Sequence, residues 1–111
     1  MFMTQACCTP IGSGLDQSQA EELGSVLKTL ADPARLRILS ILALTDEVCA
    51  CDLEEPLDLS QPTVSHHIKQ LREAGFVDSE RRGKWVYHRL VPERIDEVRA
   101  ALDLTRILTD A

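Results

Sequence analysis

The pattern of residues 60–91 predicts a helical segment that passes directly into a β-hairpin. Ser60 is a favourable N-cap, and apolar residues recur after it at helical spacing until Gly75, which is a typical helix stop. Two strand-like runs follow, at residues 76–80 and 85–91, and the turn between them holds one glycine and three basic residues. This stretch therefore predicts a helix joined at once to a basic hairpin.

The rest of the chain predicts mainly helices. Asp16 is a candidate cap for a first helix with one apolar stripe, and Asp32-Pro33 ends that helix and begins a second. The second helix is apolar nearly all round, which is typical of a central core helix. A short helix fits residues 51–55, and Pro92 can begin the last one. This order predicts a mostly α fold with a β-hairpin wing (α+β), the winged helix-turn-helix.

A chain of 111 residues has the length of a single domain. Residues 1–15 show no hydrophobic period and are predicted to be a flexible arm, whereas residues 16–111 are predicted to form the folded domain. The longest uncharged apolar stretch, residues 38–44, is much shorter than the ~20 residues of a membrane span, and the first residues lack a secretory signal. We therefore expect a cytoplasmic protein with no membrane association, whose cysteines stay reduced.

Charge is unevenly distributed along the chain. The formal net charge is −6, which by itself argues against nucleic acid. Residues 60–90, however, hold six basic and three acidic side chains, a local charge of +3, and the remaining residues carry −9. A basic region on an acidic body favours one docking face for phosphate, although charges scattered over an ordinary surface would look similar.

The predicted helix after Ser60 carries the side-chain types that read DNA bases. Gln can pair with adenine, Lys can pair with guanine, and Ser, Thr and His can donate or accept hydrogen bonds. A solvated polar face is the ordinary alternative, but the basic turn beside it favours DNA, since such a turn suits phosphate or the minor groove. The candidate DNA-contact residues are Ser60, Gln61, Thr63, Ser65, His66, Lys69 and Gln70 on the helix, and Arg81, Arg82 and Lys84 in the turn.

The histidines do not belong to a recognisable catalytic set. His66 and His67 are neighbours on the predicted helix, so they point about 100° apart and cannot share a metal there. We expect His66 to face the DNA groove, His67 to face the helix packing and His88 to lie on the wing surface. No Ser-His-Asp or paired-carboxylate arrangement is evident, so the chain is not expected to be an enzyme. A small thiol oxidoreductase is the enzyme alternative, although Cys-x-x-Cys is missing.

Four cysteines in a reducing compartment point to metal, metalloid or redox chemistry. Cys7 and Cys8 are adjacent on the predicted arm and can chelate one soft ion together. Cys49 and Cys51 would diverge by about 200° inside a regular helix, so their sulfurs converge only if the helix begins at or after Cys51. A thiol at a helix N-terminus also has a lowered pKa, which favours the thiolate.

All-thiolate sites select soft ions, and the number of ligands distinguishes among these ions. Three thiolates suit arsenite or antimonite, whose central atom keeps a lone pair, whereas four suit cadmium, lead or zinc. Cys7 and Cys8 with one of Cys49 and Cys51 give the three-thiolate site, and all four give the alternative. Asp52 is a further candidate ligand if the ion is zinc. A DNA-binding protein without sensing, or a thiol redox protein, is the second alternative.

Five segments of the chain carry a resemblance to a known family: LADPARLRIL at 30–39, VCACDL at 48–53, LSQPTVSHHI at 59–68, LREAG at 71–75 and GKWVYHRL at 83–90. Over about residues 20–100 the chain resembles the ArsR/SmtB family of metal-responsive winged-helix repressors. The resemblance implies a cytoplasmic homodimer that pairs its first and last helices, binds a pseudo-palindromic operator in double-stranded DNA and leaves it when metal or metalloid binds. Because no histidine follows His88, the zinc site that some members carry on the last helix is not expected.

On the family's pattern, Cys49 and Cys51 match a Cys-x-Cys-Asp element that holds the inducer. Many arsenic-responsive members have another cysteine three residues later, where this chain has Glu54, so a purely local three-thiol site cannot form. Other members close the site with cysteines of an N-terminal arm, a role that fits Cys7 and Cys8. The resemblance therefore implies a repressor that releases its operator on binding arsenite or antimonite through these cysteines, with Cys49 favoured over Cys51.

Overall fold

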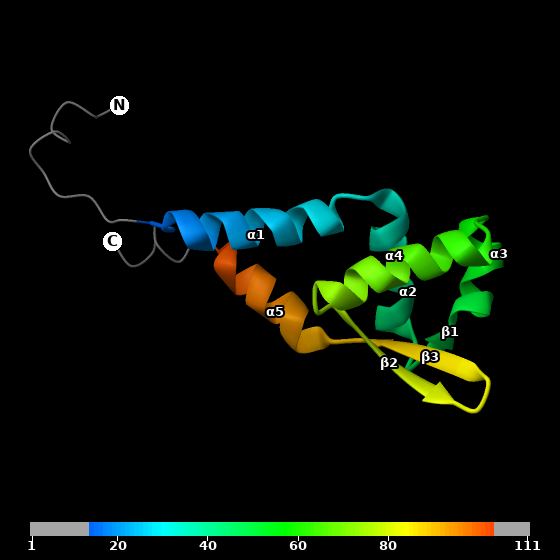
Figure 1. The fold of residues 1–111 in the computed structure, drawn as a ribbon. Helices are drawn as coiled ribbons and strands as arrows, with labels where there is room; N and C mark the ends of the chain where they lie inside the picture. The colour runs from blue at the N-terminus through cyan, green and yellow to red at the C-terminus, as the bar shows by residue number, and fades with distance from the viewer. Residues whose placement is uncertain (1–13, 104–111) are drawn as a thin grey trace, which may run out of the picture.

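The computed structural model describes residues 14–103 of the chain. In chain order its elements are α1 (Gln17–Leu30), α2 (Pro33–Leu44), β1 (Val48–Cys49), the 3-10 helix η2 (Ala50–Leu53), α3 (Glu54–Leu57), α4 (Gln61–Glu73), β2 (Val77–Arg82), β3 (Trp85–Leu90) and α5 (Pro92–Ala101). The helices α1 and α5 lie at one end of the molecule, and α3, α4 and the β2–β3 hairpin lie toward the other (Figure 1). This architecture is the predicted winged helix-turn-helix, mostly α with a β-hairpin wing.

Short-range capping bonds set the starts of the first two helices. The Asp16 carboxylate accepts a hydrogen bond of 2.8 Å from the Gln19 backbone N–H, and the Gln19 side-chain oxygen accepts one of 3.0 Å from the Asp16 N–H. This reciprocal pair is a capping box, in which two otherwise unpaired N–H groups are satisfied. Asp32 Oδ1 accepts from Ala34 N–H at 2.9 Å, and Pro33 occupies the first helical position. Both predicted caps are therefore confirmed.

Helix α4 also begins and ends where the sequence predicts. Ser60 is its N-cap, and the Ser60 and Thr63 hydroxyl oxygens are 3.0 Å apart. Gly75 has a φ of +88°, a left-handed conformation that glycine adopts without strain, and it turns the chain into β2. The predicted stripe of Val64, Ile68 and Leu71 is fully buried, so it fixes which face of α4 is left for solvent.

The sheet contains a strand that sequence analysis did not predict. Val48 and Cys49 form the two-residue strand β1, and the strand order is β1-β3-β2, with both pairings antiparallel. Because β1 pairs Val48 with His88, β3 becomes the central strand. His88 is only 6% exposed, and its Nδ1 lies 2.7 Å from the Ser79 hydroxyl oxygen. The expectation that His88 lies on the wing surface is therefore wrong.

The wing turn is shorter than predicted. Strand β2 continues through Arg81 and Arg82, which pair with Val86 and Trp85. Only Gly83 and Lys84 remain between the strands, and Gly83 has a φ of +65°. A two-residue hairpin connection of this kind needs positive φ values, which Gly83 supplies. Two of the three basic residues expected in the turn thus lie on β2 instead.

Helix α2 contributes to the centre of a single core, although not on all its sides. Ile38, Leu39 and Leu42 are buried, whereas Leu36 is 52% exposed and Leu44 is 87% exposed. The expectation that α2 is surrounded by packing is therefore wrong for its outer face. The largest fully buried side chains come mostly from α2 and α4: Phe76, Ile38, Leu42, Leu53, Ile68, Leu71 and Val64.

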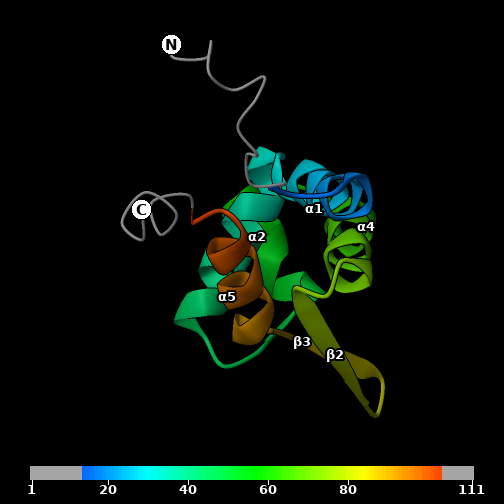
Figure 2. The same ribbon diagram turned by 90° about the vertical axis from the view of Figure 1, so that its left-hand side faces the viewer.

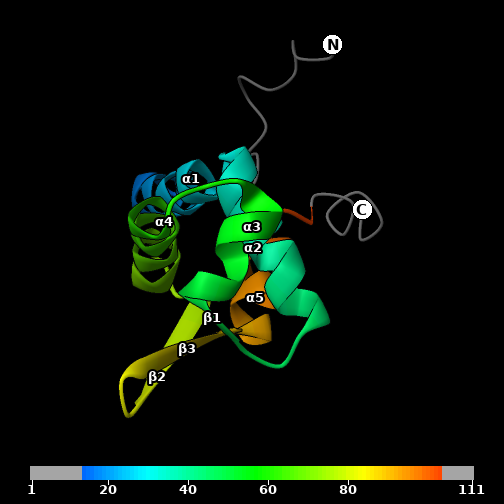
Figure 3. The same ribbon diagram turned by 90° about the vertical axis from the view of Figure 1, so that its right-hand side faces the viewer.

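Helix α4 and the hairpin lie on the same side of the molecule, and the hairpin tip projects past the helices (Figures 2 and 3). Within residues 14–103, no helix is both long enough and apolar enough to cross a membrane. Because α4 and the hairpin lie on the same side of the molecule, the outer face of α4 and the projecting hairpin are both open to solvent there.

Burial of His88 predicts a pH-dependent stability. Burial, reinforced by the positive charge of Arg72, lowers the pKa of His88 below its usual value, so the unfolded chain binds a proton more readily than the folded one. The free energy of unfolding should therefore fall as the pH drops from 7.5 to 5.5. Urea unfolding across this range should show a weaker pH dependence for His88→Gln than for the unmodified chain. The exposed His66, replaced as His66→Gln, is the control, and an equal loss of pH dependence in both variants would contradict the prediction.

Candidate nucleic-acid interface

The exposed face of α4 carries most of the side chains that sequence analysis assigned to DNA. Val64, Ile68 and Leu71 are turned into the core, and the polar residues between them therefore point outward. His66 is exposed and its Nε2 lies 3.1 Å from the Gln70 amide nitrogen. His67 is half-buried and its Nδ1 accepts a hydrogen bond of 3.3 Å from Arg35 Nε, so it faces the helix packing as expected. The exposed candidates are Ser60, Gln61, Thr63, Ser65, His66 and Lys69, while Gln70 is half-buried.

The basic residues of the wing fall into two groups. Arg82 is held by carboxylates, with its Nη2 2.9 Å from Glu47 Oε2 and 3.0 Å from Glu80 Oε1. These bonds raise the pKa of Arg82 and lower the pKa of Glu80. Arg81 and Lys84 have no ion-pair partner among residues 14–103. The guanidinium of Arg82 therefore braces the wing against the loop before β1, and Arg81 and Lys84 are left as the free cations of the tip.

Trp85 is a wing residue that sequence analysis did not single out. Its side chain is 48% exposed, and the Lys84 ammonium lies 5.5 Å from its ring. An exposed indole beside a free cation is a surface suited to sugar and phosphate. The sequence feature that could have indicated this role is an aromatic residue directly after the predicted basic turn.

The two described cysteines converge, for a reason different from the one anticipated. The helical turn begins at Ala50, before Cys51, but Cys49 is the last residue of β1 and has an extended backbone with φ −89° and ψ 151°. This change of conformation between the two residues brings the Cys51 thiol within hydrogen-bonding reach of Cys49. Asp52 Oδ2 accepts a hydrogen bond of 3.1 Å from the Cys49 backbone N–H, which fixes the start of the turn.

The acidity of Cys51 is opposite to the expected direction. Hydrogen bonding to Cys49, partial desolvation and the nearby negative charges of Cys49 and Asp52 raise the pKa of the Cys51 thiol above its usual value. The prediction of a lowered pKa is therefore wrong for Cys51. A soft cation bound by both sulfurs would relieve the repulsion between their negative charges.

The described part of the chain holds two thiols of the expected site. No group of three or more His, Cys, Asp or Glu side chains within residues 14–103 is placed to hold a metal ion. Cys49 is half-buried and Cys51 is exposed, and both are free thiols. The other predicted ligands, Cys7 and Cys8, lie outside the described residues. Two converging thiols fit part of a soft-ion site, and further ligands have to come from elsewhere.

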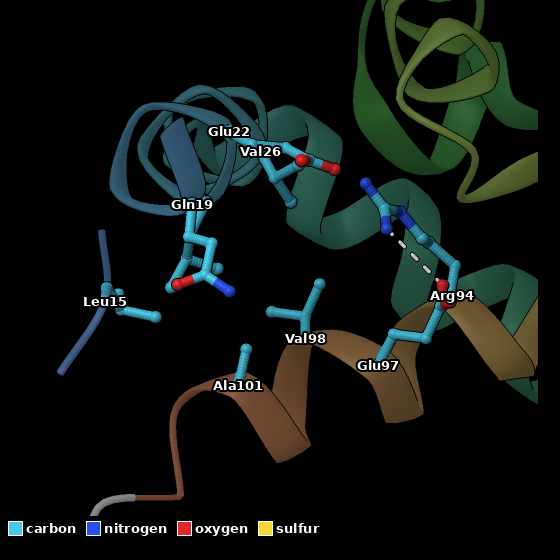
Figure 4. Close-up of a pocket in the computed structure, with 9 residues that line it drawn as sticks. Leu15, Gln19, Glu22, Val26, Arg94, Glu97, Val98 and Ala101 are labelled. Carbon is cyan, nitrogen blue, oxygen red and sulfur yellow. Dashed lines mark hydrogen bonds and ion pairs between the residues drawn. The ribbon is translucent and has the colours of Figure 1, made fainter. Parts of the chain in front are cut away.

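A second surface feature lies between α1 and α5, far from the wing. A groove of about 210 Å³ opens there, lined by apolar side chains of both helices and bordered by the Arg94–Glu97 ion pair at 3.4 Å (Figure 4). Val26 and Val98 line it and are buried, Leu15 lines it and is 52% exposed, and Leu102, the residue directly after α5, is 46% exposed. Apolar residues of the first and last helices therefore face one groove, and they leave apolar surface uncovered.

Comparisons with known proteins agree with this geometry. Residues 32–79 match the family model described as "Bacterial regulatory protein, arsR family". The chain is 50% identical over 68 residues to the arsenic resistance transcriptional regulator ArsR1 of Pseudomonas putida, a match covering 61% of this chain and 53% of that protein. It is 42% identical over 84 residues to the arsenical resistance operon repressor of Staphylococcus xylosus, covering 76% and 80%. An ArsR-like transcriptional regulator from a Rhodococcus species superimposes with a TM-score of 0.71 at 25% identity, covering 84% and 87%.

Proposed function

This chain belongs to the arsR family of bacterial regulatory proteins, which are DNA-binding transcriptional regulators and not enzymes, and on that premise we propose that it is a cytoplasmic metalloid-responsive repressor. It binds operator DNA as a homodimer and releases the DNA when trivalent arsenic or antimony is bound by cysteine thiolates. The observation that carries the proposal is the position of the converging Cys49 and Cys51 thiols beside the exposed face of α4.

The choice of inducer follows from ligand number and from the relatives. Trivalent arsenic takes three thiolates, and Cys49 and Cys51 supply at most two of them. Cys7 and Cys8 are the remaining thiols of the chain, so a complete site needs at least one of them. Relatives named as arsenic resistance regulators support arsenite over cadmium, lead or zinc, for which all four thiolates would be used.

Coupling between the ion and DNA is proposed to act across the dimer. An ion held by the N-terminal cysteines and the thiols beside α4 would tie the N-terminal segment to the DNA-binding unit. If that segment comes from the other subunit, the tie changes the spacing between the two α4 helices. Two half-sites lie about one helical turn of DNA apart, so a small change in spacing prevents both from docking together.

A release titration tests this function. The chain is first used to select a preferred duplex from a random-sequence pool, and fluorescence anisotropy then follows release from that duplex in buffer with a non-thiol reductant. Arsenite or antimonite should release DNA at lower concentrations than cadmium, lead or zinc. Greater sensitivity to cadmium or lead would establish the four-thiolate alternative, and release by none of the ions would refute sensing. Failure to select any duplex would refute the repressor assignment itself.

The α1–α5 groove predicts a dimer through these helices. Leu102 is 46% exposed at the end of α5, and burial of such apolar side chains against a second copy stabilises association. Sedimentation at micromolar concentration should show a dimer, and Leu102→Glu should shift the equilibrium toward monomer without changing the circular dichroism. Leu44→Glu, at an 87% exposed leucine on α2, is the matched control. A wild-type monomer that still binds operator would contradict the prediction.

The tip of the wing predicts a contact with phosphate. Lys84 is exposed and has no acidic partner among the described residues, so Lys84→Ala should weaken binding to all sequences alike. The slope of log affinity against log salt should fall in magnitude by about one, because binding with one phosphate contact fewer releases about one counterion fewer. Lys28→Ala, at an exposed lysine on α1, should leave the slope unchanged. An altered sequence preference in Lys84→Ala with an unchanged slope would argue against a phosphate contact.

A further inference from the structure

The thiol pair and the base-reading face of α4 share one cleft. It has a volume of about 420 Å³ and lies between α4 and β3. Cys49 and Cys51 line it, and so do Gln61 and Ser65, which are among the residues proposed to meet DNA bases. The thiols therefore lie within the DNA-facing surface and not behind it.

The charge of this cleft is positive. Lys69 and Arg72 line it from α4, and Lys84 lines it from the wing. None of the described residues that line it is acidic. A cleft with cations on two walls attracts an anion, whether that anion is a DNA phosphate or a negatively charged group attached to sulfur.

We propose that this cleft is a single site with two mutually exclusive occupants, DNA and a small group carried by the Cys49–Cys51 thiol pair. The inference rests on the proposed function, because it takes the exposed face of α4 as the DNA-binding face. It adds a direct route to release: a group on either sulfur fills space that DNA needs beside Gln61 and Ser65. A negatively charged group would also pair with Lys69 and Lys84 and withdraw them from phosphate.

The ligand class that follows is a small, thiol-directed and preferably anionic group. Such a group acts within one subunit, so its effect does not require Cys7 or Cys8. This separates the shared cleft from the change in dimer spacing, which does require the N-terminal thiols.

Alkylation of a protein without the N-terminal thiols tests the proposal. In Cys7→Ser/Cys8→Ser, Cys49 and Cys51 are the thiols that remain for alkylation. With iodoacetate, the thiolate sulfur forms a bond to the methylene carbon, iodide leaves with the electron pair of the broken C–I bond, and the thiol proton passes to buffer. Iodoacetamide adds a neutral group of nearly the same size. Carboxymethylation should lower operator affinity at least tenfold, and carbamidomethylation should lower it less.

Protection by DNA supplies a second, independent measurement. Saturating operator should slow alkylation of both thiols at least tenfold, as followed by mass spectrometry, and this rate does not depend on whether the modified protein folds. A variant that lacks all four cysteines is the control. Its operator affinity before and after treatment shows any effect of the reagent at other residues. Circular dichroism of the modified protein shows whether its helices are retained.

The outcomes separate the two proposals. Equal alkylation rates with and without bound operator, or an unchanged affinity after complete modification, would overturn the shared cleft while leaving the repressor assignment in place. Absence of DNA binding by the untreated protein would overturn the repressor assignment and the shared cleft together. Trp85, the sole tryptophan of the chain, also lines the cleft, so its fluorescence should change both on alkylation and on DNA binding.

Discussion

Serine in place of both Cys7 and Cys8 should yield a protein that binds its operator and is no longer released by arsenite. The described thiols, Cys49 and Cys51, cannot complete a three-thiolate site, so removal of the N-terminal pair removes high-affinity arsenite binding. Coupling between an inducer and DNA is typically ~1–3 kcal/mol, so arsenite should weaken operator binding of the unmodified chain about 5- to 150-fold. In the double variant, the operator affinities with and without arsenite, measured by fluorescence anisotropy, should be nearly equal.

Single substitutions at the described thiols determine the number of ligands. Cys49→Ser should abolish release, whereas Cys51→Ser should abolish it fully only if the ion takes four thiolates. Thr9→Ser, a change in the same segment that removes no thiol, is the control for the double variant. Release of the Cys7/Cys8 double variant at wild-type arsenite and cadmium concentrations would show that the N-terminal thiols are not ligands.

Alanine at Gln61 or His66 should weaken binding to the preferred operator by ~1–3 kcal/mol and reduce discrimination between operators. Both side chains are exposed on α4, and Gln61 also lines the cleft beside the wing. A lost base contact affects the preferred sequence more than others, whereas a lost phosphate contact affects all sequences equally. Competition assays against duplexes with single base changes would measure this difference.

A matched control for these variants is Glu73→Ala, at an exposed residue near the end of the same helix. It should leave sequence preference unchanged. If changes in the wing altered sequence preference and changes at Gln61 and His66 did not, the assignment of base contacts to α4 would be wrong.

Features set by neighbouring residues were predictable from the sequence. The caps Asp16, Asp32 and Ser60 act on N–H groups or hydroxyls within three residues, so their spacing alone indicates them. The stop at Gly75 depends on its own φ, which glycine permits. The buried stripe of α4 follows from helical periodicity. Together these local features of the sequence predicted the positions of the helix-turn-helix and of its exposed face.

Features set by distant residues were not predictable. The strand β1 exists because Val48 pairs with His88, forty residues away, and nothing in a two-residue strand marks it locally. The burial of His88 and the extended backbone of Cys49 both follow from that pairing. The ion pair between Arg82 and Glu47 is likewise non-local, and it engages one of the cations that the sequence assigned to DNA.

The thiol site likewise combines features that neighbouring residues set with features that distant residues set. Its chemistry was visible in the sequence as four cysteines, but the approach of Cys51 to Cys49 and the raised pKa of Cys51 depend on the path of the backbone. The cleft that joins these thiols to α4 depends on how the wing folds back beside that helix. The participation of Cys7 and Cys8 stays a prediction.

The decisive measurement is the affinity of arsenite for the free protein and for the operator complex in the same reducing buffer. Binding free energies at two coupled sites are reciprocal, so operator must weaken arsenite by the same factor by which arsenite weakens operator. We expect a matching loss of affinity of about 5- to 150-fold in both directions. Equal arsenite affinity for the free and operator-bound protein would contradict it.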